Sequence, residues 1–278
     1  MSIHILSTIV HLYERQRAII CIIVFCHKFL QMRFAITVLS LLSFICGKAQ
    51  VDTINTDNLK LNISAFAEGK SSFAVFFEDS LGNRLTSADI WDRSISISQN
   101  ASGQKAFRFE WKWYRKDTLI TNVVATGLMP SLKMLTHDAD YKARGNFSYL
   151  FTNGVVTVPE KKQRNARDSS FRVVLNPAGF EFPMDLEIFP LLPFKKVGQE
   201  FAIAFYEPGS AKSNYYHLTV TGREDLPMPG AARLACWMLR IDYAPGSYAD
   251  FWISDKSRQV VKMREYFKGR FRYKVRLY

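Results

Sequence analysis

The most constraining feature of this chain is a strict alternation of side chains at its C-terminal end. Across residues 270–277, Phe, Tyr, Val and Leu occupy every second position, and Arg or Lys occupies the positions between them. Because successive side chains of a β-strand point to opposite faces, this segment predicts a strand with one apolar and one cationic face. The stretch 248–278 reads as three strands joined by two tight turns, and we expect its apolar row to face a core.

The same period-two pattern recurs through most of the chain after residue 58, together with abundant Phe and Tyr, which favour strands. Asn153-Gly154 between two β-rich runs predicts a type I′ hairpin, since both residues tolerate positive φ. Residues 128–141 are less regular, and we expect a polar turn with a solvated His137. The strands predicted before residue 248 are 59–66, 72–78, 93–98, 107–113, 118–126, 147–151, 155–158, 171–175, 201–206, 215–221 and 231–243.

Two segments interrupt this rhythm. Residues 160–168 are charged without apolar periodicity and predict an exposed loop, with docking of an anionic partner as an alternative. Residues 180–198 are apolar but do not alternate; Pro183 suits the first turn of a short helix, and Pro190 ends it. A connector this apolar must lie against another apolar surface. The sequence therefore predicts an all-β protein with an antiparallel sheet, one face of which is covered by a short helix.

The first fifty residues read as a targeting region with an N-terminal signal helix. From Met32, one Arg precedes the apolar run 34–46, and Gly47 and Ala49 are small residues suited to cleavage before Gln50. The run is shorter than the roughly 20 residues that span a bilayer.

This pattern predicts three parts of the chain. We expect 1–31 to be an over-extended segment upstream of the true start, 32–49 to be the signal peptide, and 50–278 to be a single β-rich domain. A lipoprotein signal at Cys46 and a signal anchor made of both N-terminal apolar runs are the alternatives; the bulky Ile45 disfavours the first, and interrupting charges disfavour the second. The expected location is the periplasm or the bacterial cell envelope.

The net charge bears on the kind of binding partner, and the cysteine content bears on disulfides and thiol chemistry. The chain carries a formal net charge of +12; residues 1–49 hold five basic residues and one acidic residue, which leaves +8 for the remainder. A basic protein of this kind could bind nucleic acid or an anionic membrane surface. The predicted export signal argues against nucleic acid. Removal of the signal would leave Cys236 without a partner for an internal disulfide. We expect Cys236 to be a buried, inert thiol.

Motifs for chemistry are scarce. The sequence contains no glycine-rich phosphate loop, nucleophile elbow or paired-cysteine metal motif, so we expect no cofactor and no metal site. After residue 49 the only histidines are His137 and His217. A hydrolase would need one of them in a cleft beside a carboxylate and a hydroxyl. The expected protein is not an enzyme.

The second half of the chain, roughly residues 180–278, resembles a family of exported bacterial proteins that is known only as a domain of unknown function. The matching features are Leu192-Pro193-Phe194 with Val197-Gly198-Gln199, the strand 215–222, the strand around Trp237, Phe251-Trp252-Ile253-Ser254 and Val260-Val261-Lys262-Met263. The resemblance implies a strongly curved antiparallel sheet, open or a half-barrel, distantly similar to periplasmic lipoprotein carriers, with a helical segment over its concave face. It implies no activity and no catalytic residues.

These features lead to two candidate surfaces and a hypothesis for each. The first is an apolar concave face that binds or carries a lipid-like, apolar or amphiphilic ligand. The second is a cationic face that docks on an anionic envelope or membrane surface. The candidate ligand-binding residues are Phe107, Phe109, Trp111, Trp113, Phe189, Leu192, Phe271 and Tyr273. The candidate docking residues are Arg270, Arg272, Lys274 and Arg276.

Overall fold

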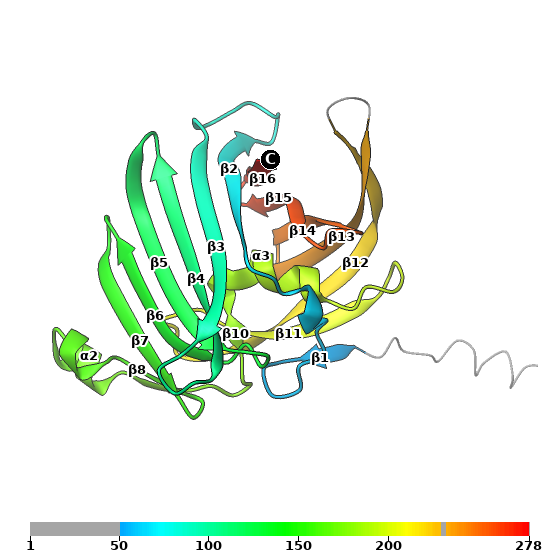
Figure 1. Cartoon of the computed structure of the whole chain (residues 1–278). Coiled ribbons are helices and arrows are strands. Elements are labelled where there is room, and N and C mark those ends of the chain that lie inside the picture. The colour runs from blue at the N-terminus through cyan, green and yellow to red at the C-terminus, as the bar shows by residue number, and fades with distance from the viewer. Residues whose placement is uncertain (1–50, 229–231, 278) are drawn as a thin grey trace, which may run out of the picture. The chain divides into compact units, whose positions relative to one another are not determined.

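The computed structural model describes residues 51–228 and 232–277, so the predictions made for 1–49 lie outside the described residues. Within those ranges, sixteen strands form one hydrogen-bonded sheet (Figure 1). The strands are β1 Asp52–Ile54, β2 Gly69–Asp79, β3 Asp89–Gln99, β4 Lys105–Arg115, β5 Thr118–Leu128, β6 Met134–Tyr141, β7 Gly145–Thr152, β8 Val155–Thr157, β9 Arg172–Val174, β10 Phe180–Glu181, β11 Glu200–Tyr206, β12 Asn214–Pro227, β13 Arg233–Ala244, β14 Ser247–Ser254, β15 Val260–Phe267 and β16 Arg270–Leu277. The helical turns are η1 Ile63–Ala65, η2 Glu160–Lys162, α2 Ala166–Ser170, η3 Phe182–Met184, α3 Asp185–Ile188 and η4 Phe189–Leu191.

The strand order places the C-terminal strand in the middle of the sheet, beside β2. It runs β1-β11-β12-β13-β14-β15-β16-β2-β3-β4-β5-β6-β7-β8-β9, and β10 adds to β11. The C-terminal strand β16 is therefore hydrogen-bonded on both sides, to β15 and to β2. All pairings are antiparallel except those of β1 and β10 with β11. The predicted all-β class and antiparallel sheet are confirmed.

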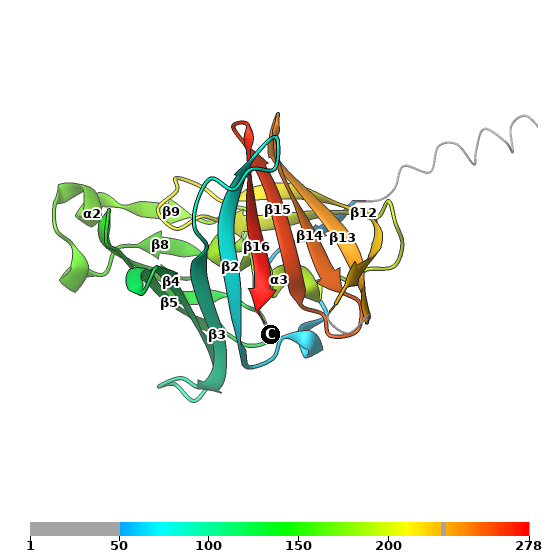
Figure 2. The same cartoon turned by 90° about the horizontal axis from the view of Figure 1, so that it is seen from above.

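The sheet is curved and open, as the views from the side and from above show (Figures 1 and 2). Bulges contribute to this shape, because an extra residue bends a strand and increases its twist. Register shifts occur in five pairings: β4–β5, β5–β6, β12–β13, β13–β14 and β14–β15. At one of them, Gly127 leaves room for the Phe107 ring, which an added Cβ would approach to 2.5 Å.

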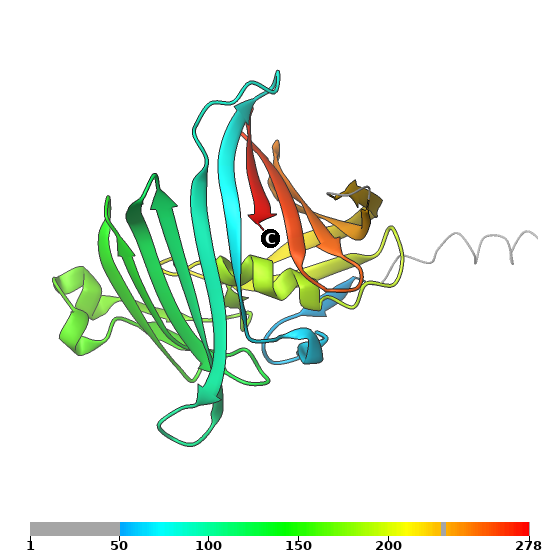
Figure 3. The same cartoon turned by 45° about the horizontal axis from the view of Figure 1, so that its top comes forward.

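The short helical segment η3–α3–η4 lies within the curve of the sheet (Figure 3). It buries Leu186, Ile188 and Phe189 in the main apolar core, where the Phe189 ring meets Phe251 edge-on at 4.9 Å. We call the face of the sheet that contacts this segment the inner face. The prediction that residues 180–198 contain a short helix over the apolar face is confirmed.

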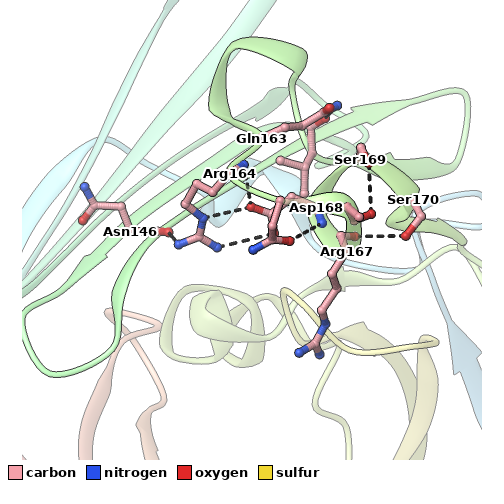
Figure 4. A network of polar contacts seen from close by, with 10 residues as sticks. Asn146, Gln163, Arg164, Arg167, Asp168, Ser169 and Ser170 are labelled. Atoms are coloured by element: carbon pink, nitrogen blue, oxygen red, sulfur yellow. Dashed lines mark hydrogen bonds and ion pairs between the residues drawn. The ribbon is translucent and has the colours of Figure 1, made fainter.

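Two local predictions are wrong, and a third is confirmed only in part. Residues 59–66 form no strand; η1 lies there, and the Asn62 amide donates to the Leu191 carbonyl instead of to a neighbouring strand. Residues 134–141, expected to be irregular, form β6. The charged run 160–168 is exposed as predicted, but it contains η2 and starts α2. Arg164 orders it by binding the Asp168 carboxylate and the carbonyl of Asn146 (Figure 4). The Asn165 side chain caps α2 by accepting a hydrogen bond from the Asp168 amide.

Candidate functional site

The last strand, β16, is turned opposite to the prediction. Lys274 is paired with Val75 of β2 and Met263 of β15, and all three side chains are buried. Directly paired residues of an antiparallel sheet share a face. The row that contains Lys274 therefore belongs to the inner face, together with Arg272 and Arg276.

The aromatic row of β16 lies on the outer face. Tyr273 stacks on Phe76 at 5.1 Å, and Phe271 packs at 5.1 Å from Tyr266. Both are only half-buried. The prediction that Phe271 and Tyr273 share one core-facing surface with the aromatic residues of β4 is wrong, because the covering segment supplies acidic partners for the basic row.

The same reversal changes the cationic surface. Lys274 is 4% exposed, and Arg272 forms an ion pair with Glu265. Arg270 is exposed at the start of the strand, and Arg276 is half-buried. A planar surface cannot contact this row as a unit, since its middle lies inside the curve of the sheet.

The aromatic residues of β4 do face inward, but they divide into two groups. Phe107 and Phe109 are fully buried in the core, as are Phe189 and Leu192 of the covering segment. Trp111 and Trp113 are half-buried and line a cavity instead. Of the eight apolar candidates, only these two tryptophans border it.

The cavity has a volume of about 980 Å³ and lies between the inner faces of the two halves of the sheet and the covering segment. Its walls are rich in aromatic side chains, with charged groups placed among them. The aromatic lining residues are Trp91, Trp111, Trp113, Tyr141, Phe182, Tyr216, Tyr243 and Phe267. The charged lining residues are Arg93, Arg115, Lys142, Arg144, Asp185, Glu207, Glu265, Arg272 and Lys274.

Three tryptophans form one wall. The Trp91 ring lies 4.7 Å from Trp111 and 5.4 Å from Trp113, on the neighbouring strands β3 and β4. The Trp113 indole donates to Asp89 at 2.8 Å. The indole nitrogens of Trp91 and Trp111 are buried without a hydrogen-bond partner among the described residues. Unpaired buried donors are uncommon, and an incoming acceptor would satisfy them.

A cluster of ion pairs connects the cavity with the covering segment. Arg93 of β3 donates to the Glu187 carboxylate at 2.8 Å and to the Pro183 carbonyl at 2.6 Å. The Lys274 ammonium lies 3.5 Å from Asp185 and 4.6 Å from the centre of the Trp91 ring. We refer to Arg93, Asp185, Glu187, Glu265, Arg272 and Lys274 as the charged cluster.

Burial and neighbouring charges together set the pKa values in this cluster. Loss of hydration, with repulsion from Arg272 and Arg93, lowers the pKa of Lys274 to about 8 despite the attraction of Asp185. Burial raises the pKa of Tyr243 well above its usual value, and the nearby Asp185 and Glu265 add to the shift. Arg93 keeps a raised pKa because Glu187 and Asp185 outweigh its desolvation.

Another part of the cavity is bordered by loops. Arg144 lies 4.1 Å over the Tyr141 ring, and Glu207 follows β11. Glu207 lines the cavity. Desolvation, and then the Glu181 carboxylate, raise its pKa to about 7.

His137 was expected in a solvated turn, and that prediction is wrong. It points inward from β6 with 1% exposure, and its Nδ1 contacts the carboxylate of Glu181, which is equally buried. Attraction to Glu181 outweighs burial and raises the pKa of His137. His137 does not line the cavity of the tryptophans, while His217 is an exposed residue of β12.

Two other observations bear on chemistry. Cys236 is fully buried, as predicted, and burial raises its thiol pKa to about 11, which disfavours the reactive thiolate. Across residues 51–228 and 232–277, no group of three or more His, Cys, Asp and Glu side chains is arranged to hold a metal ion. In the same ranges, no helix is long and apolar enough to cross a membrane.

Sequence reasoning missed several lining residues, and for two of them a signal was present. Arg93 shares the face of Ile95 in the alternating run of β3, so a charge occupied a predicted inward position. Asp185 and Glu187 interrupt an otherwise apolar covering segment in the same way. A buried charge of each sign indicates a pair across the core. Trp91, Tyr216 and Tyr243 carried no comparable signal, because aromatic residues are ordinary in strands.

Comparison with known proteins gives little further information. No protein-family model matches the chain, and no curated protein does. Among solved structures, the chain is similar to a beta-barrel-like protein of the domain of unknown function DUF1849 from Brucella abortus. The match has 9% sequence identity and a TM-score of 0.42, and it covers 76% of this chain and 96% of the other.

Proposed function

We propose that this protein is a non-enzymatic, exported envelope protein that binds or carries a lipid-like amphiphilic molecule in the cavity of the inner face. The observation that supports this most directly is the cavity itself, with a volume of about 980 Å³ and eight aromatic lining residues. Small-molecule sites are typically concave and mostly apolar, with a few polar groups that fix orientation, and they measure roughly 300–1,000 Å³. Side chains normally fill protein interiors and leave few voids larger than a water molecule, so an interior space of this size is unusual.

The location of the tryptophans supports a direct test. Trp91, Trp111 and Trp113 border the cavity, whereas Trp237 and Trp252 do not. A brominated fatty acid quenches indole fluorescence at short range. We expect it to quench delipidated protein saturably, and replacement of Trp111 or Trp113 by Phe to remove part of the quenched signal.

The other tryptophans provide the control. Trp237→Phe and Trp252→Phe should lower total fluorescence but leave the quenched portion intact. Mass spectrometry of molecules that co-purify with protein from its native envelope would identify the ligand. Absence of saturable quenching by fatty acid and phospholipid probes, with no co-purifying amphiphile, would contradict the proposal.

A further inference from the structure

The charged cluster gives information about the ligand that the aromatic walls do not, and an inference drawn from it rests on the proposed function. A purely apolar ligand needs no cations beside its site. Burying an ammonium is costly unless it is paired and hydrogen-bonded. Yet Lys274 and Arg272 both line the cavity, with side chains 5% and 31% exposed.

The acidic partners of Lys274 compensate its charge incompletely. Within the part of the chain that the structure describes, the only carboxylate within 4.0 Å of its ammonium is Asp185, at 3.5 Å. Asp185 also faces Arg93, 3.9 Å away. Glu187 is engaged by Arg93, and Glu265 is engaged by Arg272 at 2.5 Å. An ammonium has three donors, so Lys274 retains capacity for another acceptor.

The surroundings of Lys274 favour an anion. Arg272 lies on the same face of β16, and the Trp91 ring, whose buried indole donor is unpaired among the described residues, lies under the ammonium. The lowered pKa of Lys274 agrees with a cation that is underpaired in this state. An acidic oxygen beside Lys274 would add the missing charge–charge attraction and a charge-assisted hydrogen bond.

We propose that the bound amphiphile carries an acidic head group, that Lys274 and Arg272 bind it, and that its apolar part lies against Trp91, Trp111 and Trp113. The competing explanation is that the charged cluster only fastens the covering segment to the sheet. The two explanations differ in whether ligand affinity depends on the charge of the head group.

The experiment compares dibromostearic acid with its methyl ester, measured by tryptophan quenching. The two probes share the same chain and differ in charge. We expect the acid to bind wild-type protein at least about tenfold more tightly, the size of one charge-assisted hydrogen bond. Lys274→Met should weaken binding of the acid by a similar factor and leave the affinity for the ester unchanged.

Lys262→Met is the matched control. Lys262 also lies over a tryptophan, 4.5 Å from the Trp252 ring, but on the outer face. It should change neither affinity. Equal binding of acid and ester by wild-type protein would overturn the acidic head group while leaving the proposed function intact. Binding of neither probe would overturn both, and an acid preference that survives Lys274→Met would overturn the role of Lys274.

A measurement on wild-type protein covers the case in which the variant does not fold. The charged groups that act on Lys274 are Asp185, Arg93, Arg272 and Glu265. Raising the pH from about 7.5 to about 9.5 removes the proton of Lys274 while the fatty acid stays ionised. The affinity for the acid should fall over this interval and that for the ester should not. A flat profile for both would contradict the proposal.

Discussion

At the scale of single residues, the buried ammonium of Lys274 makes the stability of the fold depend on pH. Its folded-state pKa of about 8 lies below the ordinary value of 10.5. Between these values the unfolded chain holds a proton that the folded protein lacks, so the free energy of unfolding rises with pH. Below about pH 8 both states are protonated, and the burial cost is fully present.

We therefore expect Lys274 alone to raise the free energy of unfolding by on the order of 1–3 kcal/mol between about pH 7.5 and 9.5. The raised pKa values of the Cys236 thiol and of Tyr243 act in the opposite direction, so the contribution of Lys274 is the difference between wild-type protein and Lys274→Met. Urea unfolding at the two pH values measures it. The free energy of unfolding should rise by this amount more in wild-type protein and in Lys262→Met than in Lys274→Met. If the free energy of unfolding changed equally with pH in Lys274→Met and in wild-type protein, the pH dependence would come from other groups.

Gly127 supports a second prediction. A Cβ at this position would lie 2.5 Å from the Phe107 ring and 2.8 Å from the Lys133 carbonyl oxygen, which is part of the backbone and cannot turn away. We expect Gly127→Ala to destabilise the protein by about 1–3 kcal/mol, as overpacking does.

Gly69→Ala is the matched control for Gly127. Gly69 is also a strand residue, but an added Cβ would meet nothing within 4 Å. Its replacement should be neutral or stabilising, because alanine loses less conformational entropy on folding. Thermal unfolding compares the variants, and equal effects at the two sites would show that the clash at Gly127 relaxes.

Which residues face inward could be predicted from the sequence for β4 but not for β16. In β4 all charged residues between Phe107 and Trp113 lie on one face. That face points away from the core, because burying unpaired charges is costly. In β16 the same reasoning fails, because Asp185 from a distant segment partly compensates the charge of Lys274. Alternation shows that a strand has one apolar and one charged face. Whether the charged face can be buried depends on the charge of the segment that covers it.

At the scale of secondary-structure elements, the covering segment is fastened by Arg93. Its guanidinium binds the Glu187 carboxylate and the Pro183 carbonyl, and its side chain is 2% exposed. Removing one member of a buried ion pair leaves its partner uncompensated, which costs about 3–5 kcal/mol. We expect Arg93→Met to destabilise the protein by this amount in urea unfolding.

Arg108→Met provides the comparison. Arg108 lies on the outer face of β4, half-exposed, with Glu110 at 3.8 Å. Exposed pairs contribute little, so the change should stay within about 0.5 kcal/mol. A small effect of Arg93→Met would show that the segment is held by its apolar contacts alone.

Elements with local signals were predictable. Asn153-Gly154 forms the expected hairpin between β7 and β8, with both residues at positive φ. β6 was missed because Asp138 and Asp140 have low strand propensity, and its pairing with β5 and β7 outweighs that preference. Residues 59–66 alternate like a strand but pack against η4.

At the scale of the whole molecule, the position of β16 links segments that are far apart in the chain. Tyr273 pairs with Phe76, nearly 200 residues earlier. No local pattern specifies such a pairing. As far as the local sequence shows, β16 and β2 could each have been an unpaired edge strand. This placement brings the basic row opposite α3 and creates the charged cluster of the cavity. The cavity could therefore not be predicted, although the sheet could.

The strand order also predicts which backbone amides are best protected from hydrogen exchange. C-terminal segments usually fray. Here β16 lies between two long strands near the middle of the sheet, whereas the three-residue β9 ends the strand order and lies at an edge (Figure 2). Core strands open only with global unfolding, while edges open locally at lower free energy.

We expect amides of β16, such as those of Tyr273 and Val275, to exchange at rates set by global unfolding, as slowly as those of β3. Amides of β9 should exchange at least about tenfold faster, which corresponds to about 1.4 kcal/mol. Exchange measured by NMR or mass spectrometry under native conditions compares them. Fast exchange in β16, at the rate of β9, would mean that the sheet opens between β15 and β2 and that the two halves fold as separate units.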